Sequence, residues 1–179
     1  MGGIVNRLHI VGGKNHGKTT LVVELVMEFA RRGVPVGTIK HTHHRHELDV
    51  PGKDSHRHRM AGAAGVGILS PSMCAVFLPR DEKDFEQDRY SFFASVFANC
   101  RLVLVEGDSQ ARAPKIEVWR SDRGTPPLAS HDKSILALVT DDVPPIGAKV
   151  FRRSDVAQLA DWILSNMPGE QFVGSSLGK

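Results

Sequence analysis

A glycine-rich stretch near the start of the chain constrains its fold more than any other feature. It reads Gly12-Gly13-Lys14-Asn15-His16-Gly17-Lys18-Thr19-Thr20 and fits the pattern G-x-x-x-x-G-K-[ST] of a phosphate-binding loop. Glycines let the backbone turn tightly, so that N–H groups converge on phosphate oxygens. The lysine ammonium can bridge the outer phosphates, and the first threonine hydroxyl can complete a Mg2+ shell. We therefore predict that residues 12–20 bind the phosphates of a nucleotide and that Thr19 also binds the metal.

The segments on either side of this loop predict a strand–loop–helix–strand unit. Residues 7–11 have the pattern of a short buried strand. The apolar residues that follow the loop lie on one face of a helix, namely Leu21, Val22, Leu25, Val26 and Phe29. Gly33, which follows two arginines, is a helix C-terminal signal, and residues 36–39 form the next predicted strand. Such a unit implies a parallel pair of strands with a right-handed crossover.

The remainder of the chain continues the alternation of strands and helices. Strands are predicted at 66–69, 74–78, 102–105, 115–120 and 135–139, of which 115–120 alternates and should be half-exposed. Helices are predicted at 55–64 and 156–164, and a helical stripe at 92–97. The fold class is therefore α/β, a P-loop NTPase-like three-layer sandwich with a mostly parallel central sheet. We expect one nucleotide-binding domain at 1–168 and a flexible tail at 169–179.

Composition excludes several classes of protein. The 179 residues are 41% hydrophobic and 24% charged, which is ordinary for a soluble globular protein. The net charge of +3 is too small to indicate nucleic acid as a partner. No segment resembles a signal peptide and no apolar run could cross a bilayer, so we expect no membrane association and a cytoplasmic location. Cys74 and Cys100 are expected to be buried free thiols.

Four acidic residues and two basic residues are candidates for the site beside the phosphate loop. Glu106 ends an apolar strand, where ligands collect in open α/β sheets, so we predict that it holds Mg2+ or orients water as the catalytic residue. Asp49 is a further candidate metal ligand, as is Asp54, although both can equally be loop acids. Asp141, which follows the last buried strand, is a candidate reader of the base or a turn residue. Lys40 and His41, at the end of the second strand, are expected to contact the nucleotide.

Six of the nine histidines lie between residues 41 and 58. Imidazole suits Zn2+ and Ni2+, so the cluster can be interpreted as a transition-metal site. The other interpretation is that some of these histidines contact phosphate or a partner and the rest face water.

The motifs taken together resemble those of a known family. They are the phosphate loop, Lys40-His41-Thr42-His43-His44, Asp49-x-Pro51-Gly52-Lys53-Asp54-Ser55, Ala61-Gly62-Ala63 and Leu104-Val105-Glu106-Gly107, followed by Pro114-Lys115-Ile116 and the region of Thr140-Asp141. In this order they closely resemble the molybdopterin-guanine dinucleotide biosynthesis protein B (MobB) family over nearly the whole chain. The phosphate loop is common to many families, so the block from Lys40 to Ala63 is the specific part.

The resemblance implies a P-loop fold, binding of GTP with Mg2+, weak hydrolysis at most, and a homodimer. It also implies an adapter that supports a molybdopterin guanylyltransferase, the enzyme that attaches GMP to molybdopterin, by delivering GTP or the pterin. Residues 12–20 would hold the phosphates, and residues 40–55 would line the second half of the site and meet the pterin phosphate. One departure is that Asp108-Ser109 replaces the family's usual aromatic residue and lysine. This change should weaken anion binding or shift it to Arg112 or Lys115.

Two other functions compete with the adapter. In a metallochaperone GTPase, the histidine cluster would hold Ni2+ or Zn2+ for delivery. A small-molecule kinase needs an arginine-rich lid that shields the transferred phosphoryl group from water. The segment Arg80–Arg89 is too acidic for such a lid, so the kinase ranks last.

Overall fold

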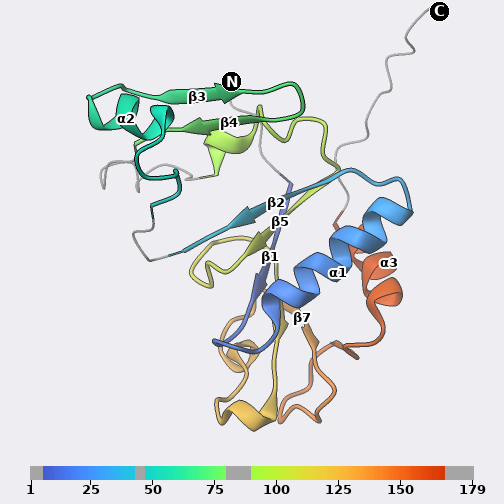
Figure 1. The fold of residues 1–179 in the computed structure, drawn as a ribbon. Coiled ribbons are helices and arrows are strands. Elements are labelled where there is room, and N and C mark those ends of the chain that lie inside the picture. The colour runs from blue at the N-terminus through green and yellow to red at the C-terminus, as the bar shows by residue number, and fades with distance from the viewer. Residues whose placement is uncertain (1–5, 43–46, 80–89, 168–179) are drawn as a thin grey trace, which may run out of the picture. The chain divides into compact units, whose positions relative to one another are not determined.

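The computed structural model describes residues 6–42, 47–79 and 90–167, which form two compact units (Figure 1). The first unit combines residues 1–42 with 92–179, and the second comprises residues 43–91. The predicted tail at 169–179 lies outside the described residues, and a single domain over 1–168 stays a prediction.

A parallel sheet forms the centre of the first unit. Its strands are β1 (Arg7–Val11), β2 (Val36–Lys40), β5 (Leu102–Glu106), β6 (Lys115–Val118), β7 (Ile135–Val139) and β8 (Val150–Phe151). They lie in the order β2-β5-β1-β6-β7-β8, and each neighbouring pair is parallel. Strand β1 is therefore flanked by β5 and β6, and the segments that follow these three strands meet at one edge of the sheet. This arrangement confirms the predicted α/β fold with a mostly parallel sheet.

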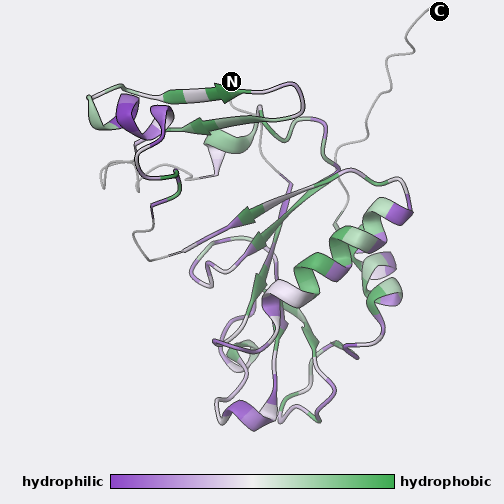
Figure 2. Cartoon of the chain, in the orientation of Figure 1, coloured by the Kyte–Doolittle hydropathy of each residue, from purple (hydrophilic) through white to green (hydrophobic). Residues whose placement is uncertain are grey.

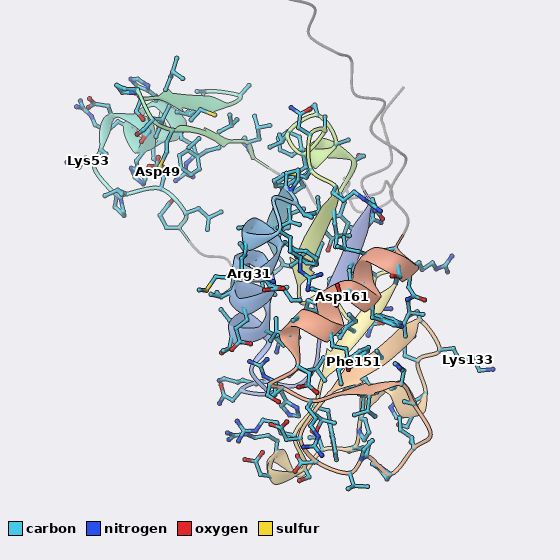
Figure 3. The ribbon with its side chains drawn as sticks, turned by 90° about the vertical axis from the view of Figure 1, so that its right-hand side faces the viewer. Arg31, Asp49, Lys53, Lys133, Phe151 and Asp161 are labelled. Atoms are coloured by element: carbon cyan, nitrogen blue, oxygen red, sulfur yellow. The ribbon has the colours of Figure 1, made fainter. Side chains whose placement is uncertain are left out.

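Two helices pack on one face of this sheet and enclose the hydrophobic core. Helix α1 (Lys18–Arg31) and helix α3 (Val156–Asn166) lie side by side in Figure 1 and contact each other. The predicted apolar face of α1 is buried with inward residues of the central strands, such as Leu8, Leu104 and Ile116. Phe151 of β8, labelled in Figure 3, packs against Trp162 of α3 with 5.5 Å between ring centroids. Arg32 and Asp161 join the two helices by an ion pair of 2.5 Å.

The other face of the sheet carries buried polar side chains, which the sequence did not predict. Strand β6 is buried along its whole length, so the prediction of a half-exposed strand is wrong. Its polar residues have partners further along the chain: Lys115 pairs with Asp132, and the carboxylate of Glu117 accepts hydrogen bonds from the Leu128 and Ala129 amides. Those amides belong to the short 3-10 helix η4 (Leu128–Ser130). Burial of charged groups is tolerated here because each is paired.

The second unit contains a short helix and a hairpin. Helix α2 (Asp54–Met60) is shorter than the predicted 55–64 segment, and β3 (Val66–Leu69) pairs with β4 (Cys74–Phe77) in antiparallel fashion. Both strands are coloured largely as hydrophobic in Figure 2. Several of their apolar side chains are nevertheless exposed, including Leu69 at 88% and Val76 at 62%. Val66 is the one buried side chain in these two strands, so the hairpin encloses little hydrophobic core of its own.

Two further predictions are corrected by the structure. The stripe at 92–97 does not form a helix: only a 3-10 helix, η2 (Ser91–Phe93), is present. Phenylalanine is a weak helix former, and Phe97 instead lies against the backbone of Gly37, so tertiary packing decides the conformation. Cys74 is exposed and Cys100 is half-buried, so the expectation of two buried thiols is wrong for Cys74, which lies in the exposed hairpin. None of the helices within the described ranges has the length and apolar character needed to span a bilayer.

The fully buried His9 of β1 predicts a pH-dependent loss of stability. Burial lowers the pKa of His9 from 6.5 to about 4, against the opposing effect of its hydrogen bond with the Gly107 carbonyl. The unfolded chain therefore takes up a proton at a higher pH than the folded chain does. As the pH falls from 6.5 towards 4, the free energy of unfolding should fall by about 3 kcal/mol from this residue alone.

Urea unfolding followed by tryptophan fluorescence measures this effect, because Trp119 and Trp162 both lie in the first unit. The His9→Leu variant should lose that part of the pH dependence. An identical pH dependence in the two proteins would contradict the assignment.

Candidate phosphate-binding site

The glycine-rich loop connects β1 to α1 and is shaped by left-handed residues. Gly12 and Gly17 have φ angles of 136° and 98°, and Asn15 is one of two non-glycine residues with positive φ in the described residues, at 64°. A Cβ atom on Gly12 would lie 2.2 Å from the Val118 carbonyl oxygen at the end of β6, so glycine is required there. Helix α1 then begins with no acidic residue in its first turn and no side-chain cap. The backbone N–H groups of this turn, with their partial positive charge, form the kind of surface that binds anions.

Lys18 extends back over the loop. Its Nζ atom donates hydrogen bonds to the carbonyl oxygens of Gly12 at 3.0 Å and Gly13 at 2.7 Å. Burial lowers the pKa of Lys18; the carboxylate of Glu106 opposes this shift, and Lys40 adds to it. The ammonium is thus held over the loop, where phosphate oxygens would be the stronger acceptors.

Thr19 and Glu106 are brought together from positions 87 residues apart in the sequence. The Thr19 hydroxyl donates a hydrogen bond of 2.6 Å to the Oε1 atom of Glu106. Thr19 lies in the first turn of α1 and Glu106 ends β5, and the two elements meet because β5 pairs with β1. A hydroxyl beside a carboxylate offers two hard oxygen atoms, which suits Mg2+, an ion that usually takes its remaining ligands from water and substrate phosphates. The residues present therefore fit the predicted metal.

His16 connects the loop to the neighbouring strand. Its side chain is buried and packs on Gly13, and its Nδ1 atom accepts a hydrogen bond of 3.3 Å from the backbone N–H of Arg120, just beyond β6. Burial, together with the charge of Lys18, lowers the pKa of His16, which keeps the ring neutral and able to accept this bond. Sequence reasoning included His16 as a loop residue but missed Val118 and Arg120. The alternating segment 115–120 was the available signal, since a strand next to β1 must end beside the loop.

The remaining candidate residues lie in different places. Lys40 is paired in register with Glu106, and the His41 amide donates to the Glu106 carbonyl at 3.0 Å, so both lie at the same sheet edge as the loop.

Asp141 follows β7, and its Oδ1 atom accepts a hydrogen bond from the Arg153 amide at 2.9 Å. Lys14, Asn15 and Thr20 are exposed. The roles of all these residues in binding stay predictions.

Asp49 belongs to the second unit and is buried there. Its Oδ1 atom accepts hydrogen bonds from the Val50 amide and the Ser55 hydroxyl. Within that unit it orders the approach to α2, and its role as a metal ligand stays a prediction. Of the six clustered histidines, His43, His44 and His46 lie outside the described residues. In the parts of the chain that the structure describes, no group of three or more His, Cys, Asp or Glu side chains is arranged to hold a metal.

The sheet order, the glycine-rich loop between β1 and α1, and the Lys18 and Thr19 positions together define an α/β protein with a P-loop NTPase-like fold. Residues 7–141 match the family described as molybdopterin guanine dinucleotide synthesis protein B, MobB. The chain belongs to this family.

Curated relatives and solved structures agree with this assignment. The chain is 34% identical over 154 residues to the molybdopterin-guanine dinucleotide biosynthesis adapter protein of Escherichia coli strain K12, covering 84% of this chain and 87% of that protein. It is 34% identical over 158 residues to the adapter protein of the same name from Haemophilus influenzae, covering 87% and 86%. A crystal structure of molybdopterin-guanine biosynthesis protein B has a TM-score of 0.70 at 30% identity, with 90% of this chain and 98% of that chain covered.

The close contact of Gly12 with β6 predicts a large cost for a side chain at this position. In Gly12→Ala the new methyl group would collide with the Val118 carbonyl at a backbone φ of 136°. We expect the free energy of unfolding to fall by roughly 3 kcal/mol or more. Gly124→Ala is a matched control, because Gly124 also has positive φ (68°) but has no atom within 4 Å of its virtual Cβ. It should cost about 1 kcal/mol. Equal losses in urea unfolding would show that the contact with β6 is unimportant.

Proposed function

We propose that this protein is a GTP-binding adapter in molybdopterin-guanine dinucleotide biosynthesis. The observation that carries the proposal is the Lys18 ammonium and the Thr19–Glu106 pair lying at one glycine-lined loop. The names of the curated relatives, which are adapter proteins in that biosynthesis, support the biological role. The metallochaperone alternative gains no support from any of these relatives.

In the proposed site the phosphates of GTP lie on the loop amides of residues 12–20. Lys18 exchanges its bonds to the Gly12 and Gly13 carbonyls for bonds to phosphate oxygens. Thr19 and Glu106 hold Mg2+, which would neutralise phosphate charge when bound. Lys40, which is paired in register with Glu106, adds positive charge on the β2 side, and Asp141 is the candidate for contact with the base.

Hydrolysis is at most a slow side activity in this proposal. Glu106 is the candidate to orient water, but in this proposal the same carboxylate also holds Mg2+ together with Thr19, so it is not dedicated to water. An adapter needs to hold GTP rather than consume it, so this arrangement suits the proposed role.

A homodimer and a cytoplasmic location are part of the same proposal. The exposed apolar side chains of the β3–β4 hairpin are consistent with a second copy of the chain as their cover, because two strands alone cannot bury them.

Isothermal titration calorimetry with GTP and Mg2+ tests the nucleotide site. Lys18→Ala removes the charge-assisted hydrogen bonds to phosphate, so the dissociation constant should rise by about a hundredfold or more. Lys133→Ala removes the same charge from an exposed side chain that points away from the fold (Figure 3), and it should bind GTP like the unchanged protein. Unchanged affinity in Lys18→Ala, with an intact circular dichroism spectrum, would refute the site.

Capture of a purified molybdopterin guanylyltransferase on the immobilised chain tests the adapter role. We expect retention of the enzyme with GTP and Mg2+ present. The Lys18→Ala variant should retain less, if nucleotide contributes to the complex. No retention by the unchanged, folded protein would rule out the adapter proposal while leaving nucleotide binding untouched.

A further inference from the structure

A pocket of about 590 Å³ lies in the first unit, away from the glycine-rich loop. It is formed by the segment that links β5 to β6 and by the turn before β7. Its lining residues are Ser109, Gln110, Ala111, Arg112, Ala113, Pro114, Lys115, Asp132 and Ser134. This volume is within the range of pockets that bind small organic molecules.

The wall of the pocket is the short segment between β5 and β6, which contains no helix. Both of its ends are hydrogen-bonded to β1. The Gly107 amide donates to the Ile10 carbonyl at 2.9 Å, and the His9 amide donates to the Pro114 carbonyl at 3.0 Å. Gly107 and Asp108 both have positive φ, at 93° and 56°, which turns the chain sharply after Glu106. The residues between these anchors, 109–113, are left to line the pocket.

The floor of the pocket is a buried ion pair. Lys115 is only 3% exposed, and its Nζ atom lies 3.1 Å from Asp132 Oδ2 and 2.5 Å from the Ser134 hydroxyl. Hydrogen bonds from Ser134, together with the charge of Lys115, lower the pKa of Asp132, so this carboxylate is charged and directed towards its own partners. The pair is electrically neutral as a unit, and the Lys115 ammonium has a third N–H donor beyond these two contacts.

The wall adds hydrogen-bond donors that no described residue of the protein engages. Arg112 is exposed and forms no hydrogen bond or ion pair with any described residue, and the same is true of the Ser109 and Gln110 side chains. The guanidinium is therefore the uncompensated charge among the lining residues. A planar guanidinium with five N–H donors matches the oxygen atoms of a phosphate group. Ala111, Ala113 and Pro114 provide an apolar wall next to it.

We propose that this pocket is a second anion site, which binds the phosphate monoester of a small organic molecule. Arg112 and the Ser109 hydroxyl bind the phosphate, the free N–H of Lys115 adds a contact from the floor, and the organic part lies on Ala111, Ala113 and Pro114. Asp108, which precedes Ser109, is buried and does not line the pocket.

The pocket and the phosphate loop are separate sites on one strand. Strand β6 begins with Lys115 at the pocket and ends with Val118 against Gly12, a separation of roughly 10 Å along the strand. The proposal therefore does not rest on nucleotide binding by the loop, and either one can fail alone.

Amide chemical shifts of the ¹⁵N-labelled full chain test the pocket directly. The titrations use the Lys18→Ala variant, so that phosphate binding by the glycine-rich loop does not contribute. Phenyl phosphate and inorganic phosphate are the probes, and phenol is the control for apolar binding alone. Saturable shifts are expected for the amides of residues 109–115 (Pro114 has none) and for Ser134. Phenyl phosphate should bind about tenfold more tightly than inorganic phosphate, because its ring covers the apolar wall.

Two variants locate the binding. Arg112→Gln should weaken binding of phenyl phosphate by about tenfold or more. Arg152→Gln removes an equally exposed arginine outside the pocket and should change nothing. The proposal is overturned if these amides do not shift with either phosphate, or if Arg112→Gln binds as well as the unchanged arginine. Equal shifts with phenol would also overturn the anion site, and equal affinity for the two phosphates would overturn the organic ester as its ligand.

Discussion

The contact between Gly12 and the Val118 carbonyl is the constraint on which the site depends. Strand β1 lies between β5 and β6, and its last residue leads directly into the glycine-rich loop. Because β6 extends past the end of β1, its terminal carbonyl lies where a Cβ atom of residue 12 would be. The loop must therefore turn at Gly12, and this turn sets the start of α1 and the positions of Lys18 and Thr19. A local backbone contact thus fixes the geometry of side chains six and seven residues later.

The charged side chains at the loop already have hydrogen-bond partners within the protein. The Lys18 ammonium is bonded to two loop carbonyls, and the Glu106 carboxylate accepts the Thr19 hydroxyl. In each contact, a side chain that suits phosphate or Mg2+ is hydrogen-bonded instead to a weaker partner in the protein. The loop is in this way held in a formed conformation by the same side chains that would contact the ligand. Exchange of partners, rather than folding of the loop, is then what ligand binding requires, and a preformed site of this kind has little ordering entropy to overcome.

Sequence reasoning succeeded where local pattern and sheet topology decide the outcome. The loop, α1 and the strands around it follow from short-range signals, and Glu106 was located because parallel strands end at a common edge. It failed where a residue distant in the sequence decides whether a side chain is buried or which conformation a segment takes. Lys115 and Glu117 made β6 look half-exposed, but Asp132 and the η4 amides allow both to be buried. Phe97 packs on Gly37 instead of continuing a helix, and no pattern within residues 92–97 encodes that contact.

The buried polar side chains on the second face of the sheet help to explain why a pocket can exist at the segment that links β5 to β6. A long helix on that face would need a continuous apolar surface beneath it, but His9, Lys115 and Glu117 place hydrogen-bonding groups among the buried apolar residues. Such groups are satisfied by loops that bring backbone amides, carbonyls and short polar side chains, as Leu128, Ala129 and Ser134 do. Loops pack less continuously than a helix, and the crossover that begins at Gly107 leaves the hollow at residues 109–115. Because this crossover starts at the residue after Glu106 and is anchored on β1 at both ends, the proposed metal ligand and the pocket wall are parts of one short, continuous segment.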